Sequence, residues 1–258
     1  MGETIGAMTW TDQALMELFD DVACAVRRSL DGLDDWGLMT DGAHTGQHFS
    51  DVLADTVALE RLALADVGVL SEESGLARPH SDIVVIVDPV DGSTNASRGI
   101  PWFATSLAAV DADGLRAALV VNQATGVRFS AVRGGGAFCD GRPITPSAAA
   151  SWDKAIVGVS GLPPASPGWS QYRALGACAL DLCAVACGTL DAYLDCSQDA
   201  HGVWDYAAAM LVCHEAGAHV VDALGRDLLV MDHTARRTPV AGASLAVLDG
   251  ALSARRTF

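Results

Sequence analysis

Two aspartates separated by only a proline and a valine are the residues of this chain best suited to chemistry. Asp88 and Asp91 lie in the string DPVDGSTN, which follows the apolar run IVVIV of residues 83–87. A run of β-branched residues without polar alternation predicts a strand buried on both faces. Pro89 has no N–H and is expected to end that strand. Two carboxylates held together at a strand end could bind a hard cation.

The second half of the same string offers groups of the opposite kind. Asp91-Gly92 is expected to turn the chain, and Ser93, Thr94 and Asn95 are residue types that begin helices. Free backbone N–H groups at a helix start bind anions such as phosphate. The string therefore predicts one turn that holds both a cation and a phosphate. A plain β-turn with an aspartate cap explains the Asp-Gly pair but not the whole string.

Two further carboxylates stand at the edges of predicted elements. Glu72 follows a short predicted strand at residues 67–70, and Asp205 begins a predicted helix at residues 204–217. Each one alone is more often a cap or a surface charge. Together with Asp88 and Asp91 they could ring a pair of Mg²⁺ ions, because Mg²⁺ prefers oxygen ligands at about 2.0–2.1 Å. The scattered histidines and cysteines show no zinc-type spacing that competes with this interpretation.

Composition excludes several classes of partner. The chain has 258 residues, half of them hydrophobic, and a formal net charge of −16. Such a charge repels nucleic acid. No secretory signal is visible at the N-terminus, and no apolar run approaches the ~18–20 residues of a membrane helix. The cysteines are odd in number and lack a C-x-x-C motif. We therefore expect a cytoplasmic protein with no nucleic-acid partner and no membrane association.

The first half of the chain predicts two helices and then an antiparallel meander. Residues 11–30 have the apolar spacing of one helical face, with Thr11 as N-cap, and residues 49–64 form the second helix. Residues 103–110, 115–121 and 126–132 are the predicted meander strands, joined by short turns. The domain boundary is placed after the glycine-rich segment that ends at residue 144. This gives two subdomains, 1–144 and 145–258.

The second half alternates between strands and helices, which favours two layered α/β subdomains. Helices are expected at residues 176–188 and 204–217. The expected strands are residues 155–159, 191–195, 219–221 and 244–247.

Five segments in this order resemble one known family. They are SEESG around Glu72, DPVDGSTN at residues 88–95, GGGAFCDG, RALGACALD and WDYAAAMLVCHEAGA at residues 204–218. The chain resembles the inositol monophosphatase family of Mg²⁺-dependent, Li⁺-sensitive phosphatases. The superfamily also includes fructose-1,6-bisphosphatases and 3′-phosphoadenosine 5′-phosphate phosphatases. The resemblance implies an α/β (α+β) fold, a layered αβαβα sandwich, and a homodimer.

The resemblance also implies a ligand set for two Mg²⁺ ions. Glu72, Asp88 and the carbonyl of Val90 would hold the first ion. Asp88, Asp91 and Asp205 would hold the second, with Asp88 bridging. Members of the family often have a lysine in the loop at residues 32–47, and this chain has none there. The resemblance therefore leaves open whether a third, weaker metal site is present.

Further roles concern the substrate. The N–H groups of Gly92 and Ser93 would bind the phosphate of a small phosphate ester. Gly176, Cys178 and Asp195 fall where the family contacts the alcohol part of its substrate. The stretch at residues 196–203 looks longer than in typical inositol monophosphatases, and we expect it to set substrate choice.

The expected activity is hydrolysis of a small polyol or sugar phosphate, similar to inositol monophosphate, by metal-activated water. Fructose-1,6-bisphosphatase and nucleotide phosphatase are the alternatives. An inactive, ligand-sensing relative is a remote one, since no ligand carboxylate is missing. The predicted catalytic residues are Glu72, Ser93 and Asp55, with Asp55 accepting a proton through the Ser93 hydroxyl. Asp51 lies on the same helix face at i, i+4, and is the less favoured partner.

Overall fold

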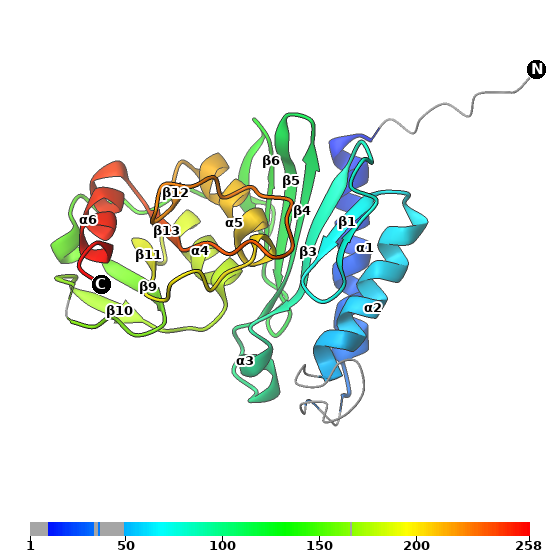
Figure 1. The fold of residues 1–258 in the computed structure, drawn as a ribbon, viewed down its shortest axis with the longest axis horizontal. Coiled ribbons are helices and arrows are strands. Elements are labelled where there is room, and N and C mark those ends of the chain that lie inside the picture. The colour runs from blue at the N-terminus through cyan, green and yellow to red at the C-terminus, as the bar shows by residue number, and fades with distance from the viewer. Residues whose placement is uncertain (1–9, 34–35, 37–48, 166) are drawn as a thin grey trace, which may run out of the picture.

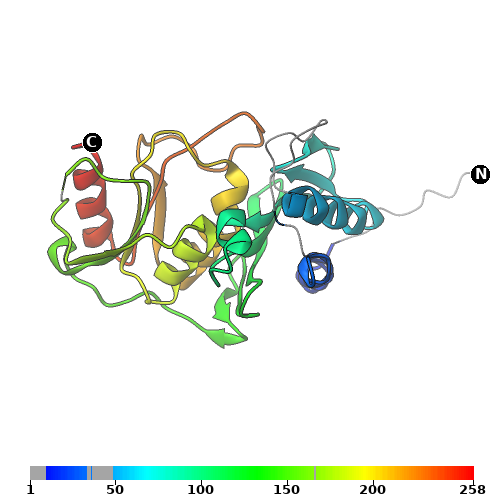
Figure 2. The same cartoon turned by 90° about the horizontal axis from the view of Figure 1, so that it is seen from below.

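The helices and sheets stack as five layers in the order αβαβα (Figure 1). The computed structural model describes residues 10–33, 36, 49–165 and 167–258. Helices α1 (Asp12–Leu30) and α2 (Phe49–Leu64) lie side by side on one face of the first sheet (Figure 2). Helices α4 (Cys178–Ala186) and α5 (Val203–Ala216) lie between the sheets, and α6 (Leu245–Arg255) covers the far face of the second. This arrangement confirms the predicted layered sandwich.

The first sheet contains the predicted meander and carries the main motif. Its order is β2-β1-β3-β4-β5-β6-β7-β8, and all neighbours are antiparallel except the parallel pair β1 and β3. The strands are β1 (Gly68–Ser71), β2 (Gly75–Ala77), β3 (Val84–Asp91), β4 (Ala104–Asp111), β5 (Gly114–Asn122), β6 (Arg128–Val132), β7 (Gly136–Cys139) and β8 (Arg142–Pro143). Glu72 therefore leaves β1 beside the strand that carries Asp88 and Asp91.

The second sheet has five strands in the order β10-β9-β11-β13-β12. They are β9 (Ile156–Ser160), β10 (Gln171–Arg173), β11 (Ala192–Asp195), β12 (His219–Asp222) and β13 (Pro239–Gly242). The sheets thus occupy residues 68–143 and 156–242, and the predicted boundary at residue 144 falls in the connection between them. The division into two subdomains stays a prediction. In the part of the chain that the structure describes, no helix is long and apolar enough to cross a membrane.

Strand β3 corrects one expectation. The sequence predicts an end at Pro89, but the strand continues to Asp91. Its antiparallel register with β4 shifts between Asp88 and Asp91, so Pro89 lies in an irregular part of the ladder, where its missing N–H is tolerated. The hydroxyl of Thr105 donates to the Pro89 carbonyl at 2.8 Å. The two aspartates are therefore fixed by the sheet itself and not by a turn after it.

A second expectation that the structure corrects concerns the C-terminal end of the chain. Residues 244–247 are predicted to form a strand, but they begin α6, and the Ser244 hydroxyl accepts the N–H of Val247 as an N-cap. A short apolar run fits either element, and the serine cap decides for the helix. The strand at this end of the chain is β13, which the sequence analysis missed. The cap predicted at Thr11 is confirmed, since its hydroxyl accepts the N–H of Ala14.

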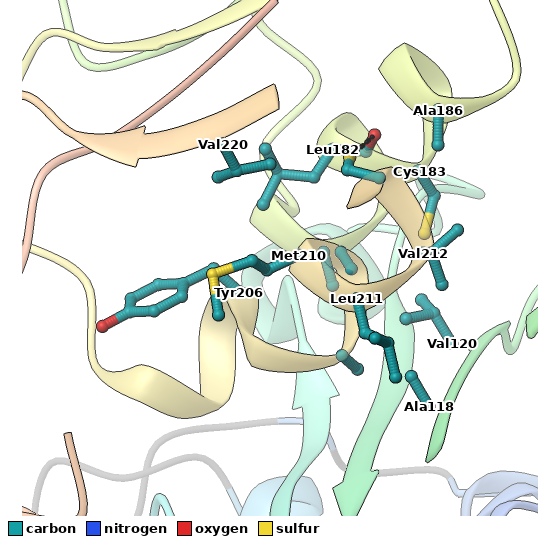
Figure 3. Close-up of a cluster of buried hydrophobic side chains, with 14 of the residues drawn as sticks. Ala118, Val120, Leu182, Cys183, Ala186, Tyr206, Met210, Leu211, Val212 and Val220 are labelled. Atoms are coloured by element: carbon teal, nitrogen blue, oxygen red, sulfur yellow. Dashed lines mark hydrogen bonds between the residues drawn. The ribbon is translucent and has the colours of Figure 1, made fainter. Parts of the chain in front are cut away.

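The largest apolar core lies between the sheets and surrounds α4 and α5 (Figure 3). Both helices are apolar on nearly all sides, which is typical of a buried central layer. Leu182 and Cys183 of α4 are fully buried, and Cys183 lies beside Val212 of α5. The same packing holds the first turns of α4 and α5 in place, and both turns carry groups of the site.

Truncation of this core is expected to cost far more stability than truncation at the surface. Leu182→Ala removes a fully buried side chain and should lower the free energy of unfolding by about 2–5 kcal/mol. Leu162→Ala is the matched control, because Leu162 is 88% exposed and should change that value by less than about 0.5 kcal/mol. Denaturant unfolding measures both variants. Similar losses in the two would contradict the assignment of the core.

Candidate active site

Three carboxylates from two elements converge at the end of β3. Asp88 and Asp91 come from the strand, Asp205 from the first turn of α5, and one oxygen of each lies within 4.8 Å of the others. Asp88 is 1% exposed and Asp91 is 7% exposed. Like charges this close repel one another, and water cannot screen them when they are buried. Bound protons or a cation are therefore needed to offset the repulsion among these carboxylates.

Backbone N–H groups satisfy part of each aspartate. Val90 donates to Asp88 Oδ1 at 2.9 Å, and Ala179, in the first turn of α4, donates to Asp91 Oδ2 at 2.7 Å. The other oxygen of Asp88, Oδ2, is buried and has no hydrogen-bond partner among the described residues. Buried polar atoms in native proteins nearly always have a partner. An orphaned carboxylate oxygen inside an all-oxygen donor set fits a hard divalent cation.

Glu72 lies at the edge of this cluster. Its N–H donates to the Val87 carbonyl at 3.3 Å, and its own carbonyl lies 2.7 Å from Nε2 of His233. Burial raises the pKa of Glu72 to about 8, and the charges of Asp205, Glu73 and Asp91 add to the shift. The same two causes, burial first, raise the pKa of Asp88 well above its usual range.

The pKa of Asp91 rises less because more donors surround it. Burial and the charge of Asp205 raise it, while the N–H groups of Ala179 and Cys178 and the charge of His201 lower it, with a net pKa of about 7. Without a cation, the cluster is therefore partly protonated at neutral pH. A bound cation would displace these protons.

Gly92 shapes the phosphate side of the site. It has φ +87°, and a Cβ there would lie 3.1 Å from the Gly176 carbonyl oxygen, so glycine is the residue that fits. It precedes α3 (Ser93–Ser97), whose Asn95 donates to the carbonyls of Trp102 and Leu175 at 2.7 Å. These contacts tie the motif to the segment before α4. Gly176 is thus brought beside the motif, and its contact with the alcohol part of a substrate stays a prediction.

Asp55 makes its side-chain hydrogen bonds with residues other than Ser93. Its two carboxylate oxygens accept the hydroxyls of Ser71 and Ser74, which flank Glu72 in the chain, and Asp55 is 4% exposed. Asp51, one helical turn earlier, is half-buried, and its charge is among those that raise the pKa of Glu72. Because residues four apart share a helix face, the sequence could not decide which one approaches the cluster. Residues 37–48, part of the predicted loop before α2, lie outside the described residues.

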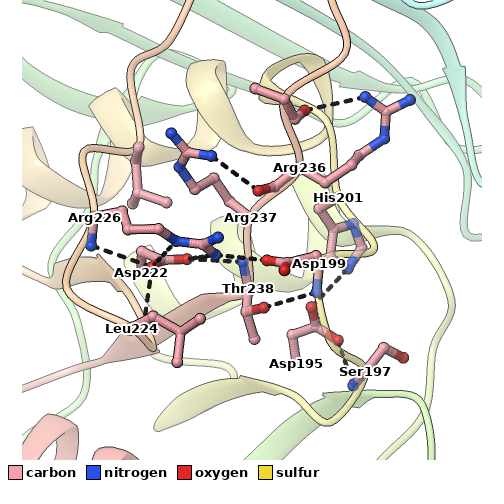
Figure 4. A network of polar contacts seen from close by, with 12 residues as sticks. Asp195, Ser197, Asp199, His201, Asp222, Leu224, Arg226, Arg236, Arg237 and Thr238 are labelled. Atoms are coloured by element: carbon pink, nitrogen blue, oxygen red, sulfur yellow. Dashed lines mark hydrogen bonds and ion pairs between the residues drawn. The ribbon is translucent and has the colours of Figure 1, made fainter.

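The remaining substrate-side residues are deeply placed. Cys178 is buried and its N–H donates to Asp91 Oδ1 at 3.2 Å. Asp195, at the end of β11, is 0% exposed. His201 stands between Asp195 and Asp205, at 3.7 Å and 3.3 Å from their oxygens. Figure 4 shows His201 beside Asp195 and the polar residues that surround them. The sequence analysis did not single out His201, although it marked the stretch at residues 196–203 that contains it.

The protonation of His201 follows from its neighbours. Burial alone would lower its pKa, but the hydrogen bond with Asp205 and the charges of Asp205, Asp195 and Asp91 raise the pKa to about 9. His201 is therefore a cation at neutral pH in the metal-free protein. It offsets part of the charge of the carboxylates.

A second histidine was also missed. His233 comes from the segment between β12 and β13, which reaches across to the first sheet (Figure 1). The ring centroids of His233 and Trp204 are 5.0 Å apart. The guanidinium carbon of Arg236 also lies over the Trp204 ring, 4.9 Å from its centroid. Contacts between segments so far apart in the sequence leave no local signal.

Comparison with known proteins agrees with this geometry. A model of the inositol monophosphatase family matches residues 51–254. The fructose-1,6-bisphosphatase of Pyrococcus furiosus is 34% identical over a match of length 193, and the match covers 69% of this chain and 70% of that protein. A fructose-1,6-bisphosphatase/inositol-1-monophosphatase of Archaeoglobus fulgidus is 32% identical over a match of length 219, which covers 81% of this chain and 84% of that protein.

The fold has close structural counterparts. The solved structure of a hypothetical protein from Pyrococcus horikoshii, with similarities for inositol-1 monophosphatase, has a TM-score of 0.85 and 25% identity to this chain. The match covers 95% of this chain and 99% of that one. All the clustered carboxylates lie inside the matched range of the family model.

We expect Asp88→Asn to stabilise the metal-free protein, and to do so more strongly as the pH rises. The raised pKa of Asp88 means that its protonated form stabilises the fold fully below its ordinary pKa of 3.8, and that this stability is lost as the pH rises towards the folded pKa. Asparagine needs no proton, so the gap between variant and wild type should widen above pH 3.8. Thermal unfolding in EDTA at several pH values measures it.

The exposed Asp249→Asn is the matched control and should show no such trend. An Asp88→Asn protein that is less stable than wild type at every pH would contradict the account of repulsion.

Proposed function

Because the chain belongs to the inositol monophosphatase family, whose members are metal-dependent phosphatases, we propose that it hydrolyses the phosphate ester of a small polyol or sugar with Mg²⁺. The observation that carries this proposal is the buried carboxylate cluster with its orphaned Asp88 oxygen. No described residue donates a hydrogen bond to that oxygen, so it needs a cation or a proton. The repulsion among these carboxylates destabilises the fold unless a cation binds, and this favours an active metal-dependent enzyme over an inactive relative.

The proposed ligand set follows from the donors present. Glu72, Asp88 and the Val90 carbonyl would hold one Mg²⁺, and Asp88, Asp91 and Asp205 a second. When bound, the two ions neutralise the phosphate, lower the pKa of an attacking water and stabilise the leaving oxygen. The proposal needs no covalent intermediate, so Ser93 is not assigned as a nucleophile.

The chain's own groups would position the reactants. The N–H groups of Gly92 and Ser93 would donate to the phosphate oxygens. The Ser93 hydroxyl would accept a hydrogen bond from the attacking water and donate one to a carboxylate that takes up the proton. We assign that carboxylate to Asp51 and not to Asp55, because Ser71 and Ser74 already occupy both oxygens of Asp55.

The identity of the substrate is a separate, more specific proposal. The relatives from P. furiosus and A. fulgidus are named as fructose-1,6-bisphosphatases, the second also as an inositol-1-monophosphatase. Fructose 1,6-bisphosphate is therefore the second candidate substrate. The homodimer and the cytoplasmic location also stay predictions, and light scattering of the purified protein tests the first.

Phosphate release should depend on Mg²⁺. We expect no turnover in excess EDTA, recovery on addition of Mg²⁺, and inhibition by Li⁺. The assay compares inositol 1-phosphate, fructose 1,6-bisphosphate and 3′-phosphoadenosine 5′-phosphate, and the highest kcat/KM identifies the substrate class. Full turnover in EDTA would exclude the proposed chemistry.

Ser93→Ala and Asp51→Asn should each lower kcat by about 10²–10⁴-fold, the usual contribution of a positioned general base. Because two members of one relay are not additive, the double variant should be hardly worse than the worse single variant. Asp55→Asn is the comparison on the same helix face and should lower kcat much less. If Asp55→Asn is the more damaging change and Asp51→Asn is nearly silent, Asp55 is the base after all.

A further inference from the structure

The end of β11 lies close to the carboxylate cluster. Asp195 ends the strand, and its Oδ2 lies 3.7 Å from Nε2 of His201. The other ring nitrogen of His201 lies 3.3 Å from Asp205, a member of the cluster. Asp195 is therefore one side chain away from the proposed metal ligands, on the side of the site where the sequence predicts the alcohol part of the substrate.

The carboxylate of Asp195 is tied to the turn that follows the strand. Its Oδ1 accepts the N–H of Ser197 at 2.9 Å, and Figure 4 shows this contact. Its Oδ2 is buried and has no hydrogen-bond partner among the described residues. Buried acceptors in native proteins nearly always have a donor. The turn at residues 195–197 thus directs an oxygen whose missing donor a hydroxyl of the proposed polyol could supply.

Arg255 holds the backbone of this turn. It is the last residue of α6, which packs against the second sheet (Figure 1). Its Nε donates to the carbonyl of Asp195 and its Nη2 donates to the carbonyl of Ser197, both at 2.9 Å. Because a guanidinium is planar and rigid, two donations at once fix the two carbonyls relative to each other. Arg255 therefore fixes both ends of the turn that directs Asp195.

The guanidinium of Arg255 is itself held. Its central carbon lies over the ring of Phe258, 5.1 Å from the ring centroid, and the side chain is half-buried. A cation over an aromatic face is attracted to the ring. This contact keeps the guanidinium in place beside the turn.

The other side of the turn packs against the end of β9. The N–H of Cys196 donates to the carbonyl of Ser160 at 2.7 Å. The next residue, Gly161, approaches so closely that a Cβ there would lie 2.6 Å from Ser197 Oγ. The turn is therefore held between β9 and α6, and Arg255 makes the side-chain contacts from α6.

We propose that Arg255 is a positioning residue for the alcohol of the substrate. By its hydrogen bonds to the carbonyls of Asp195 and Ser197 it keeps the turn in the conformation that receives the alcohol. The inference rests on the proposed function, since it takes the end of β11 as the side that receives the polyol. Arg255 acts on the turn and not on the metal ligands, so its loss should affect recognition of the alcohol and leave the metal site intact.

Two esters separate these effects. Inositol 1-phosphate has a polyol large enough to reach the turn, whereas the alcohol of methyl phosphate is too small. Arg255→Met removes the donors and keeps a long unbranched side chain. It should lower kcat/KM for inositol 1-phosphate by up to about 10²-fold, the loss that a misplacement of about 1 Å can cause. Its kcat/KM for methyl phosphate and its Mg²⁺ affinity in calorimetric titration should stay close to those of the wild type.

Arg256→Met is the matched control, because Arg256 is the next residue and is exposed. It should behave as the wild type does with both esters. Arg255→Lys keeps the charge but has no planar fork, and its kcat/KM for inositol 1-phosphate should lie between those of the wild type and Arg255→Met. If Arg255→Met does not fold, Arg255→Lys is the test variant and should show the same selective loss.

Three results in the test variant would overturn the proposal. They are an equal loss of kcat/KM with both esters, a weakened Mg²⁺ affinity, and an unchanged kcat/KM for inositol 1-phosphate. Failure of the proposed function would appear in the wild type instead, which would then hydrolyse neither ester or show no preference for inositol 1-phosphate over methyl phosphate.

Discussion

Repulsion among buried carboxylates is the constraint on which the rest of this structure depends. Asp88 and Asp91 are almost inaccessible, and Asp205 brings a third carboxylate within 4.8 Å of them. Burial and mutual charge raise the pKa of Asp91 to about 7 and that of Glu72 to about 8. Such a cluster opposes folding unless protons, donors or a cation compensate for it. The fold is best understood as the set of elements that supply this compensation.

The donors come from elements far apart in the chain. Ala179 donates from the first turn of α4, and Gly202 from the residue before α5. A helix start carries partial positive charge, so both helices favour an anion there. Packing of α4 and α5 between the sheets aims their starts at the end of β3, and this links the apolar core directly to the site. His201, whose backbone pairs with Arg237 and whose pKa the neighbouring carboxylates raise to about 9, adds positive charge beside Asp205.

Local sequence patterns predicted the main elements and the carboxylate cluster, but not the contacts between segments that are far apart in the chain. The apolar run, the carboxylate spacing and the helix starts predict β3, α5 and the carboxylates that cluster at the end of β3, because these signals lie within a few residues of each other. The end of β3 was predicted wrongly at Pro89, because the register shift that accommodates the proline depends on the pairing of β3 with β4 and not on one strand alone. Asp51 and Asp55 share a helix face, and only Ser71 and Ser74 distinguish them. His201 lies against Tyr193 of β11, Asp205 of α5 and the backbone of Arg237, which are far apart in the sequence, so no local pattern marks it.

Proton release on Mg²⁺ binding tests the central claim most directly. If the cluster holds protons because its carboxylates repel one another, a cation that binds there must displace them. Calorimetric titration at neutral pH in buffers of different ionisation enthalpy measures the number released. The account predicts a net release that falls as the pH rises past about 8, where Glu72 is already ionised. Binding of Mg²⁺ with no proton release at any pH would contradict it.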